Sequence, residues 1–388
     1  MVRRYNKLIA TLCAVFLALA APSYAQQAAP FDSKARQIYL IEESTGTVLF
    51  SRGEDELFPP ASLMKLMTAE YVFSEIKAGK ISENTEYKVS EYAWRTGGAL
   101  SRTSTMFAAL NSNIRVIDLL QGVIVQLAND GCIILAEGMA GSEEKFAEAL
   151  TARARAIGLE KSVFVNSNGL PNPGNKMTMR ELVLLARHIR IEYPQYFKLY
   201  SQDAFEWNKI FQRNKNTLIQ QNVGIDGMAT GFAEDYGFAV LATIQRNGTR
   251  LFLAMGGLKS DKERNEETKR VLEWGLTSFH KQIVFKAGET IADAPVFGGD
   301  ASHVALKAIS DIDIFVPVDN ADRIRARIAY RWPLKAPVKS GQQVGSLIIS
   351  LGERAVRTMP VYASSDIGTG TLTSKAYDGL KELLFFWL

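Results

Sequence analysis

A serine and a lysine stand three residues apart in the stretch Ser62-Leu63-Met64-Lys65. Residues at this spacing share one face of a helix, so the lysine amine can reach the serine hydroxyl. A serine becomes a good nucleophile when a neighbouring base takes its proton. A partly desolvated lysine can be that base, because burial lowers the pKa of its amine. The pair predicts catalysis through an acyl-serine, although an N-cap serine beside a surface lysine would have the same spacing.

The surroundings of the pair favour the catalytic interpretation. Pro59 and Pro60 end the preceding segment, and apolar residues then recur at helical spacing until Gly79. We expect Ser62 to open this helix. Free backbone N–H groups and the helix dipole at that position favour developing negative charge.

The elements that must position the pair indicate an α+β fold. Turn residues such as Asn247-Gly248 predict hairpins near both ends of residues 30–280. The expected strands are 37–43, 47–51, 236–245 and 250–255. Helical spacing predicts helices at 114–127, 131–139, 143–157, 179–191 and 266–279. We expect the N- and C-terminal strands to share one antiparallel sheet, with the helices packed against it.

The stretch IDGMATGF, residues 225–232, carries two glycines before an apolar run. We expect a turn that leads into the edge of a strand, where another backbone or a ligand can approach closely. The loop NSNGLPNPGN, residues 166–175, has two open interpretations, a wall of the cleft or a plain connection.

The character of the chain changes after residue 281. Short β-rich runs follow closely and no helical period is sustained, so we expect a small all-β domain at 282–372 after a first domain at 26–281. The expected strands are 282–285, 304–307, 312–317, 324–330, 343–349 and 355–361.

Residues 1–25 have the pattern of a secretory signal peptide. Arg3, Arg4 and Lys7 precede the apolar run 8–21, and Ser23-Tyr24-Ala25 fits a cleavage site. The run is too short to span a bilayer. We therefore expect export to a periplasm-like compartment.

The last residues, 373–388, predict an amphipathic helix. Its apolar face and aromatic end suit the membrane interface, so we expect a peripheral anchor. Docking on the β domain is the other interpretation.

Composition excludes several kinds of function. Loss of the three cations of the signal peptide lowers the formal charge from +4 to +1. This charge lacks the excess of positive residues that is typical of nucleic-acid-binding proteins. The three histidines are far apart and Cys132 alone would remain, so we expect neither a metal site nor an intramolecular disulfide. No organic cofactor is indicated either.

The chain resembles the D-alanyl-D-alanine carboxypeptidases, the low-molecular-mass penicillin-binding proteins, over nearly its whole length. The segments that carry the resemblance are PPASLMKLMTAEYVF, AWRTGG, GVIVQLANDGCIILAEG, NSNGLPNPGN, FQRNKNTLI and LKSDKERNEETKRVLEWG. The resemblance implies a penicillin-binding/β-lactamase-like transpeptidase domain, in which three motifs surround one cleft.

Two of the three motifs depart from the family pattern. Ser62 and Lys65 match the first motif in full. The second, normally Ser-Gly-Asn, reads Leu127-Ala128-Asn129, so its asparagine is kept and its serine is lost. The third, normally Lys-Thr-Gly, reads Ala229-Thr230-Gly231, and Ala233 follows where the family usually has a hydroxyl residue.

The resemblance also implies the roles of individual residues. Ser62, Lys65 and Asn129 would be catalytic. Thr230, Gly231 and Phe232 would bind substrate, with the N–H groups of Ser62 and Phe232 forming the oxyanion hole, and Arg264 would hold the terminal carboxylate of the substrate.

By this resemblance the protein would remove the terminal D-alanine from peptidoglycan stem peptides through acyl-Ser62, with turnover impaired at Leu127 and Ala229. β-Lactams would be covalent ligands of Ser62, and the protein would lie on the outer face of the inner membrane. A homologue that binds wall peptides or partners without turnover is the alternative. The β domain and the terminal helix argue against a β-lactamase.

Overall fold

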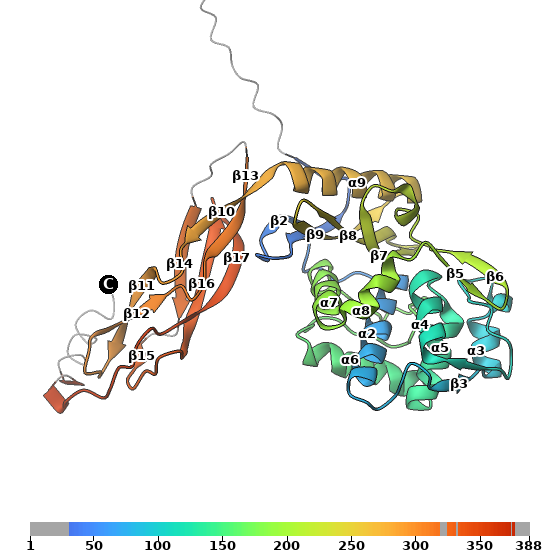
Figure 1. Cartoon of the computed structure of the whole chain (residues 1–388), viewed down its shortest axis with the longest axis horizontal. Helices are drawn as coiled ribbons and strands as arrows, with labels where there is room; N and C mark the ends of the chain where they lie inside the picture. Colours follow the sequence, from blue (N-terminus) through green and yellow to red (C-terminus); the bar gives the residue numbers. More distant parts are fainter. Residues whose placement is uncertain (1–30, 319–323, 331–332, 374, 377–388) are drawn as a thin grey trace, which may run out of the picture. The chain divides into compact units, whose positions relative to one another are not determined.

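The computed structural model describes residues 31–318, 324–330, 333–373 and 375–376 of the 388-residue chain (Figure 1). The expected signal peptide lies outside these residues. Of the expected C-terminal helix, only residues 373, 375 and 376 are described.

The first domain contains a five-stranded antiparallel sheet, whose strands lie in the order β2-β1-β9-β8-β7. Its strands are β1 (Gln37–Glu42), β2 (Val48–Arg52), β7 (Ile225–Ala233), β8 (Gly237–Arg246) and β9 (Thr249–Leu258). Tyr39 pairs with Ala254, which confirms that strands from the two ends of this region share one sheet. The α+β fold class is therefore confirmed.

Helices cover both faces of this sheet. In Figure 1, α9 lies on one face and the remaining helices lie on the other, and α7 contacts β1 and β9 while α9 contacts β8 and β9. The helices are α2 (Lys65–Lys77), α3 (Glu91–Thr96), α4 (Val116–Val125), α5 (Asn129–Ala140), α6 (Glu143–Ala156), α7 (Met179–Glu192), α8 (Pro194–Phe197) and α9 (Asp261–Thr277). Among the described residues, none of the helices is long and apolar enough to cross a membrane.

Several element boundaries differ from the sequence expectation. Ser62 does not open the α-helix: it lies in a 3₁₀ turn, η1 (Ala61–Met64), and α2 begins at Lys65. A bond from Leu63 N–H to the Pro60 carbonyl tightens this turn. Helix α9 begins earlier than expected, because the Ser260 side chain caps it by accepting from the N–H of Glu263.

The IDGMATGF stretch is itself a strand rather than a turn. It forms most of β7, which lies at the edge of the sheet and pairs along its length with β8. Sequence reasoning also missed short elements, because their patterns are too brief to show a period. Besides α3 and α8, these are β3 (Glu86–Lys88), β4 (Asn113–Arg115), β5 (Ala204–Trp207), β6 (Ile210–Arg213) and the 3₁₀ turns η2 (Ala99–Ser101), η3 (Lys198–Ser201) and η4 (Ile219–Gln221).

The regular elements of the second domain are strands up to residue 371, and its inward side chains form a separate apolar core. Its strands are β10 (Phe279–Phe285), β11 (Thr290–Phe297), β12 (His303–Lys307), β13 (Ile312–Pro317), β14 (Ile324–Tyr330), β15 (Leu334–Lys335), β16 (Gln343–Leu351) and β17 (Arg354–Tyr362). Sequence reasoning missed β11, in which Pro295 interrupts the strand pattern.

Candidate active site

The side chains of Ser62 and Lys65 meet directly. Lys65 Nζ lies 3.1 Å from Ser62 Oγ and donates a hydrogen bond to it. Ser62 is half-buried, whereas Lys65 is only 2% exposed. Burial lowers the pKa of Lys65 to about 8, and the nearby Asp130 carboxylate partly opposes this shift. The pair therefore has the geometry and the proton affinity that an activated serine needs.

The loop at 166–175 contacts the helix that carries Lys65. Lys65 Nζ also donates to the backbone oxygen of Asn168, and Thr68 Oγ1 donates to that of Ser167 at 2.5 Å. These two bonds fix the loop against the helix that carries the lysine. Sequence reasoning could not find the Asn168 contact, because a carbonyl acceptor leaves no side-chain signature.

Two glycines let the backbone pack closely around η1, the 3₁₀ turn that carries Ser62. A Cβ at Gly169 would lie 2.0 Å from the Ala61 carbonyl oxygen, and one at Gly231 would lie 3.0 Å from that of Pro60. Ala61 itself has a φ of 47°, a strained conformation for a residue with a side chain. The turn is thus held between the 166–175 loop and β7, which carries the altered third motif.

The third motif lies on β7 beside this turn. Alternation along a strand places Ala229 on the same face as Gly231, which abuts the Ser62 turn. Ala229 is 2% exposed and belongs to the apolar core cluster. Thr230 is also buried, whereas Phe232 is exposed and packs on Phe238 with ring centroids 4.6 Å apart.

The second motif spans the junction of α4 and α5. Leu127 is buried in the core cluster with a φ of 54°, in the left-handed region that suits a bulky side chain poorly. Asn129 begins α5, and its Nδ2 donates to Thr103 Oγ1 at 2.9 Å. Its buried Oδ1 has no partner among the described residues.

The Asp130 side chain, next to Asn129, binds the segment 105–108. Its carboxylate accepts from Thr105 Oγ1 at 2.6 Å and from the N–H groups of Met106 and Ala108 at 3.0 and 3.1 Å. Burial raises the pKa of Asp130, and these bonds oppose the shift. Sequence reasoning missed this role, although the residue adjoins Asn129 in a predicted helix break.

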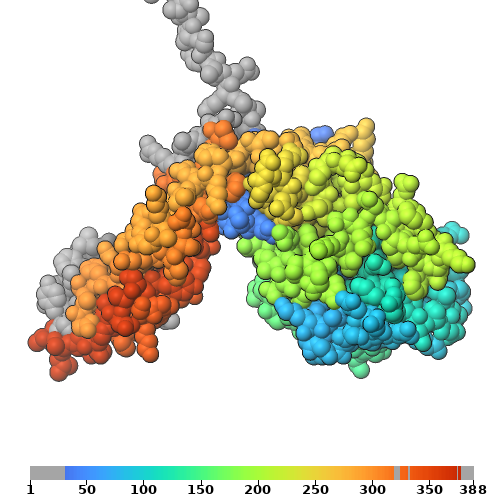
Figure 2. Space-filling view, viewed as in Figure 1, coloured from blue at the N-terminus to red at the C-terminus, as the bar shows by residue number. Residues whose placement is uncertain are grey.

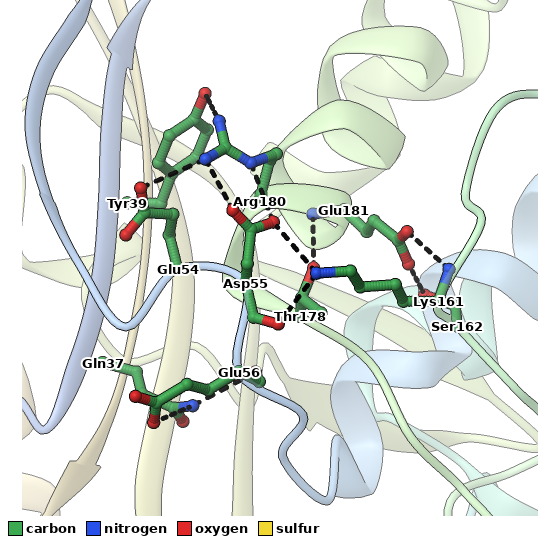
Figure 3. Close-up of polar contacts among 10 residues, drawn as sticks. All are labelled: Gln37, Tyr39, Glu54, Asp55, Glu56, Lys161, Ser162, Thr178, Arg180 and Glu181. Atoms are coloured by element: carbon green, nitrogen blue, oxygen red, sulfur yellow. Dashed lines mark hydrogen bonds and ion pairs between the residues drawn. The ribbon is translucent and has the colours of Figure 1, made fainter. Parts of the chain in front are cut away.

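A polar network fixes the chain that leads to Ser62 (Figure 3). Arg180, at the start of α7, binds both oxygens of Asp55 at 2.9 and 2.8 Å and lies over the ring of Tyr39. It also binds Glu54 at 3.1 Å, and Lys161 Nζ lies 3.7 Å from Asp55 Oδ1. These contacts anchor residues 54–55 to α7 and so restrict where the turn that carries Ser62 can lie.

Arg264 does not project freely into a cleft. It is 3% exposed on α9, with Nη2 2.5 Å from Asp261 Oδ1 and 3.0 Å from Asn265 Oδ1. Burial lowers the pKa of its guanidinium, and the Asp261 carboxylate opposes this. An anion would therefore compete with an existing ion pair at this arginine. The structure thus brings Ser62, Lys65 and Gly231 together. It places Asn129 at the start of α5, where it is bonded to Thr103, and it keeps Arg264 paired.

Comparison with known proteins gives consistent matches to both domains. The sequence profile of a family described as D-alanyl-D-alanine carboxypeptidase matches residues 23–258, and that of the penicillin-binding protein 5 C-terminal domain matches residues 279–369. The chain is 32% identical to the D-alanyl-D-alanine carboxypeptidase DacC of Escherichia coli, over 99% of this chain and 98% of the relative. It is 31% identical to DacA of Haemophilus influenzae, over 94% of each chain.

Solved structures agree with these matches. The structure of penicillin binding protein 5 from Haemophilus influenzae superposes with a TM-score of 0.73 at 30% identity, covering 87% of this chain and 99% of that one. The D-alanyl-D-alanine carboxypeptidase DacD from Francisella tularensis gives a TM-score of 0.70 at 25% identity, covering 91% and 98%.

Proposed function

Because this chain belongs to the D-alanyl-D-alanine carboxypeptidase family, we propose that it is a serine carboxypeptidase that removes the terminal D-alanine from peptidoglycan stem peptides. The observation that carries the proposal is the contact between Ser62 Oγ and the buried Lys65 amine, whose pKa is about 8. Ser62 would be the nucleophile, Lys65 its base and Asn129 a polar partner at the second motif.

The reaction divides into two steps. Neutral Lys65 takes the Ser62 proton as Oγ attacks the carbonyl carbon of the penultimate D-alanine. The peptide C–N bond then breaks, the terminal D-alanine leaves with a proton on its nitrogen, and water later cleaves acyl-Ser62. The N–H groups of Ser62 and Phe232 would stabilise the oxyanion, and Thr230, Gly231 and Arg264 would help to bind the substrate.

Turnover is slow in this proposal. Leu127 has no hydroxyl to pass a proton to the leaving amine, and Ala229 has no cation for the substrate. The same two changes favour the second candidate function, a homologue that binds wall peptides without turnover.

D-Alanine release from a pentapeptide ending in D-Ala-D-Ala tests the proposal. The mature protein is expected to release D-alanine, and a Ser62→Ala variant is expected to release none, because the covalent step is lost. The intact protein is also expected to gain the mass of a penicillin at Ser62. If neither protein released D-alanine and no adduct formed, the enzyme proposal would be wrong and the binding function would replace it.

We also propose export to the periplasm and attachment of residues 373–388 to the outer face of the inner membrane. The apolar face of the expected helix supports attachment, since burial of its leucines and aromatic residues stabilises it at the lipid interface. The full chain is expected in the membrane fraction of lysed cells, and a chain truncated after residue 372 in the soluble fraction. Equal distribution of the two would contradict the anchor.

A further inference from the structure

The Asn168 carbonyl that binds Lys65 belongs to a segment that is held from two sides. On one side, this carbonyl accepts from Lys65 Nζ, and the Ser167 carbonyl accepts from Thr68 Oγ1 at 2.5 Å. On the other side, Glu143 Oε1 accepts from the N–H and the Oγ of Ser167 at 3.0 and 2.7 Å. The same oxygen lies 3.4 Å from Asn168 Nδ2. One carboxylate oxygen therefore binds both residues whose carbonyls contact α2.

The position of Glu143 is itself fixed at the start of α6. The Ser142 side chain caps this helix by accepting from the N–H of Lys145 at 3.3 Å, so Glu143 is its first residue. The second oxygen of the carboxylate, Oε2, accepts from the Tyr92 hydroxyl at 3.1 Å. Helix α3, which carries Tyr92, lies at the surface of the molecule in the cyan part at the lower right of Figure 2. The carboxylate thus links the 166–175 loop to two helices.

The contact with the Asn168 carbonyl matters for a lysine that acts as a base. A neutral amine has one lone pair, which must face the Ser62 hydroxyl to take its proton. An N–H that donates to the Asn168 carbonyl fixes the amine and leaves its lone pair free to face Ser62 Oγ, 3.1 Å away. Displacement of the loop would remove this constraint on the amine.

The loop also separates Lys65 from solvent. A pocket of about 580 Å³ lies on the outer side of the loop and is lined by both Glu143 and Asn168, whereas Lys65 is only 2% exposed. Loosening of the loop would therefore let water from this pocket reach the amine.

We propose that Glu143 is a positioning residue of the active site, whose carboxylate holds Ser167 and Asn168 so that the Asn168 carbonyl orients and covers the Lys65 amine. Its effect on catalysis rests on the proposed function, in which Lys65 is the base. Glu143 acts through the loop, because its printed bonds go to Ser167, Asn168 and Tyr92.

Loss of this carboxylate is expected to raise the pKa of Lys65. Burial is the largest cause of the lowered pKa, so water that reaches the amine would favour the cation. Two groups of α5 also face the amine: Asp130, and Cys132, whose pKa burial raises to about 12. Both remain in a Glu143 variant, so the change would come from the solvation of the amine.

An NMR titration of the Lys65 amine from pH 6 to 10 tests the proposal without turnover. The lysine Cε atoms carry ¹³C, and a Lys65→Met variant identifies the signal. The parent is expected to titrate at about pH 8 and Glu143→Ala about one pH unit higher. Glu143→Gln should titrate as the parent does, because its amide oxygen can accept the same bonds. Glu144→Ala is the matched control, since Glu144 is an exposed carboxylate in the same turn of α6 and should have no effect.

Penicillin acylation of Ser62 measures the consequence for catalysis. At pH 7 the Glu143→Ala variant is expected to react about tenfold more slowly, because about a tenth as much of its Lys65 is neutral. The difference should shrink toward pH 10, as the amine becomes neutral in both proteins. A merely structural role would instead lower the rate by one factor at every pH and leave the titration of Lys65 unmoved.

Ser167→Ala tests the same contact with a smaller change, and it serves if Glu143→Ala does not fold. It removes only the hydroxyl that binds the carboxylate at 2.7 Å. Acylation at pH 7 should slow about threefold, again with a raised titration of Lys65. Because the two side chains form one contact, the double variant should be no slower than Glu143→Ala alone.

An unmoved titration of Lys65 in Glu143→Ala and Ser167→Ala would overturn the proposal, and so would an equal change in Glu144→Ala. These results do not depend on the carboxypeptidase proposal. A raised titration in Glu143→Ala, with neither D-alanine release nor a penicillin adduct in the parent, would leave the role of Glu143 standing and remove the activity. An adduct in the parent with an unmoved titration in both variants would do the reverse.

Discussion

Replacing Lys65 with methionine is expected to lower the rate of acylation by about 10²- to 10⁴-fold, because the variant keeps the length of the side chain and loses the base. In the unchanged protein the rate should rise about tenfold per pH unit up to about pH 8 and then level, since only neutral Lys65 accepts the Ser62 proton. The measurement is penicillin acylation of Ser62 from pH 6 to 10.

The same substitution is expected to stabilise the fold at neutral pH. The pKa of Lys65 falls from 10.5 to about 8, so the buried cation costs the folded state about 3 kcal/mol below pH 8. That cost disappears as the pH rises from 8 to 10.5, because the folded protein releases its proton first. Denaturant unfolding should therefore give the methionine variant a larger free energy of unfolding than the parent at pH 7. This difference in the free energy of unfolding should shrink as the pH approaches 10.5. An acylation rate that did not change with pH would contradict Lys65 as the base. A difference in the free energy of unfolding that grew with pH would contradict the lowered pKa of Lys65.

Restoring the family side chains at the two altered motifs is expected to raise D-alanine release by about 10²- to 10⁴-fold. Leu127→Ser supplies a hydroxyl for the leaving amine. Ala229→Lys supplies a cation from the face of β7 that abuts the Ser62 turn, worth about 1.5–3 kcal/mol for a charge-assisted contact. The two gains should not multiply, because both groups act in one network.

Two control variants separate chemistry from packing. Leu127→Ala removes the same apolar bulk without adding a hydroxyl, and Ala229→Met adds a chain of similar length without charge. Both should leave the rate close to that of the parent. D-Alanine release by the restored double variant that matched these controls would show that Leu127 and Ala229 do not limit turnover.

The sequence by itself determined the fold class and the candidate catalytic pair, Ser62 and Lys65. Strand alternation and helical periodicity are local patterns, so the shared sheet and the α+β arrangement could be predicted from particular runs such as 37–43 and 250–255. Ser62 and Lys65 are three residues apart, a spacing that places two side chains on one face whether the turn is 3₁₀ or α-helical.

Other parts of the site depend on contacts between distant segments. Lys65 reaches the carbonyl of Asn168, 103 residues away, and any residue type could have supplied that oxygen. The depressed pKa of Lys65 comes from burial by the assembled core, which no local pattern reports. The ion pair between Arg264 and Asp261 could not be predicted either, because the sequence shows both charges but does not show that Arg264 is buried.

Arg213 and Lys215, which are exposed and have no counter-ion among the described residues, show the same limit. Their residue types are plain in the sequence, but only the packing of β6 against α4 and the 103–107 segment brings them to the second motif. Short-range spacing thus determined which side chains could react. The tertiary structure decided their solvation, their partners and the charge around them, because those depend on which distant surfaces exclude water from one another.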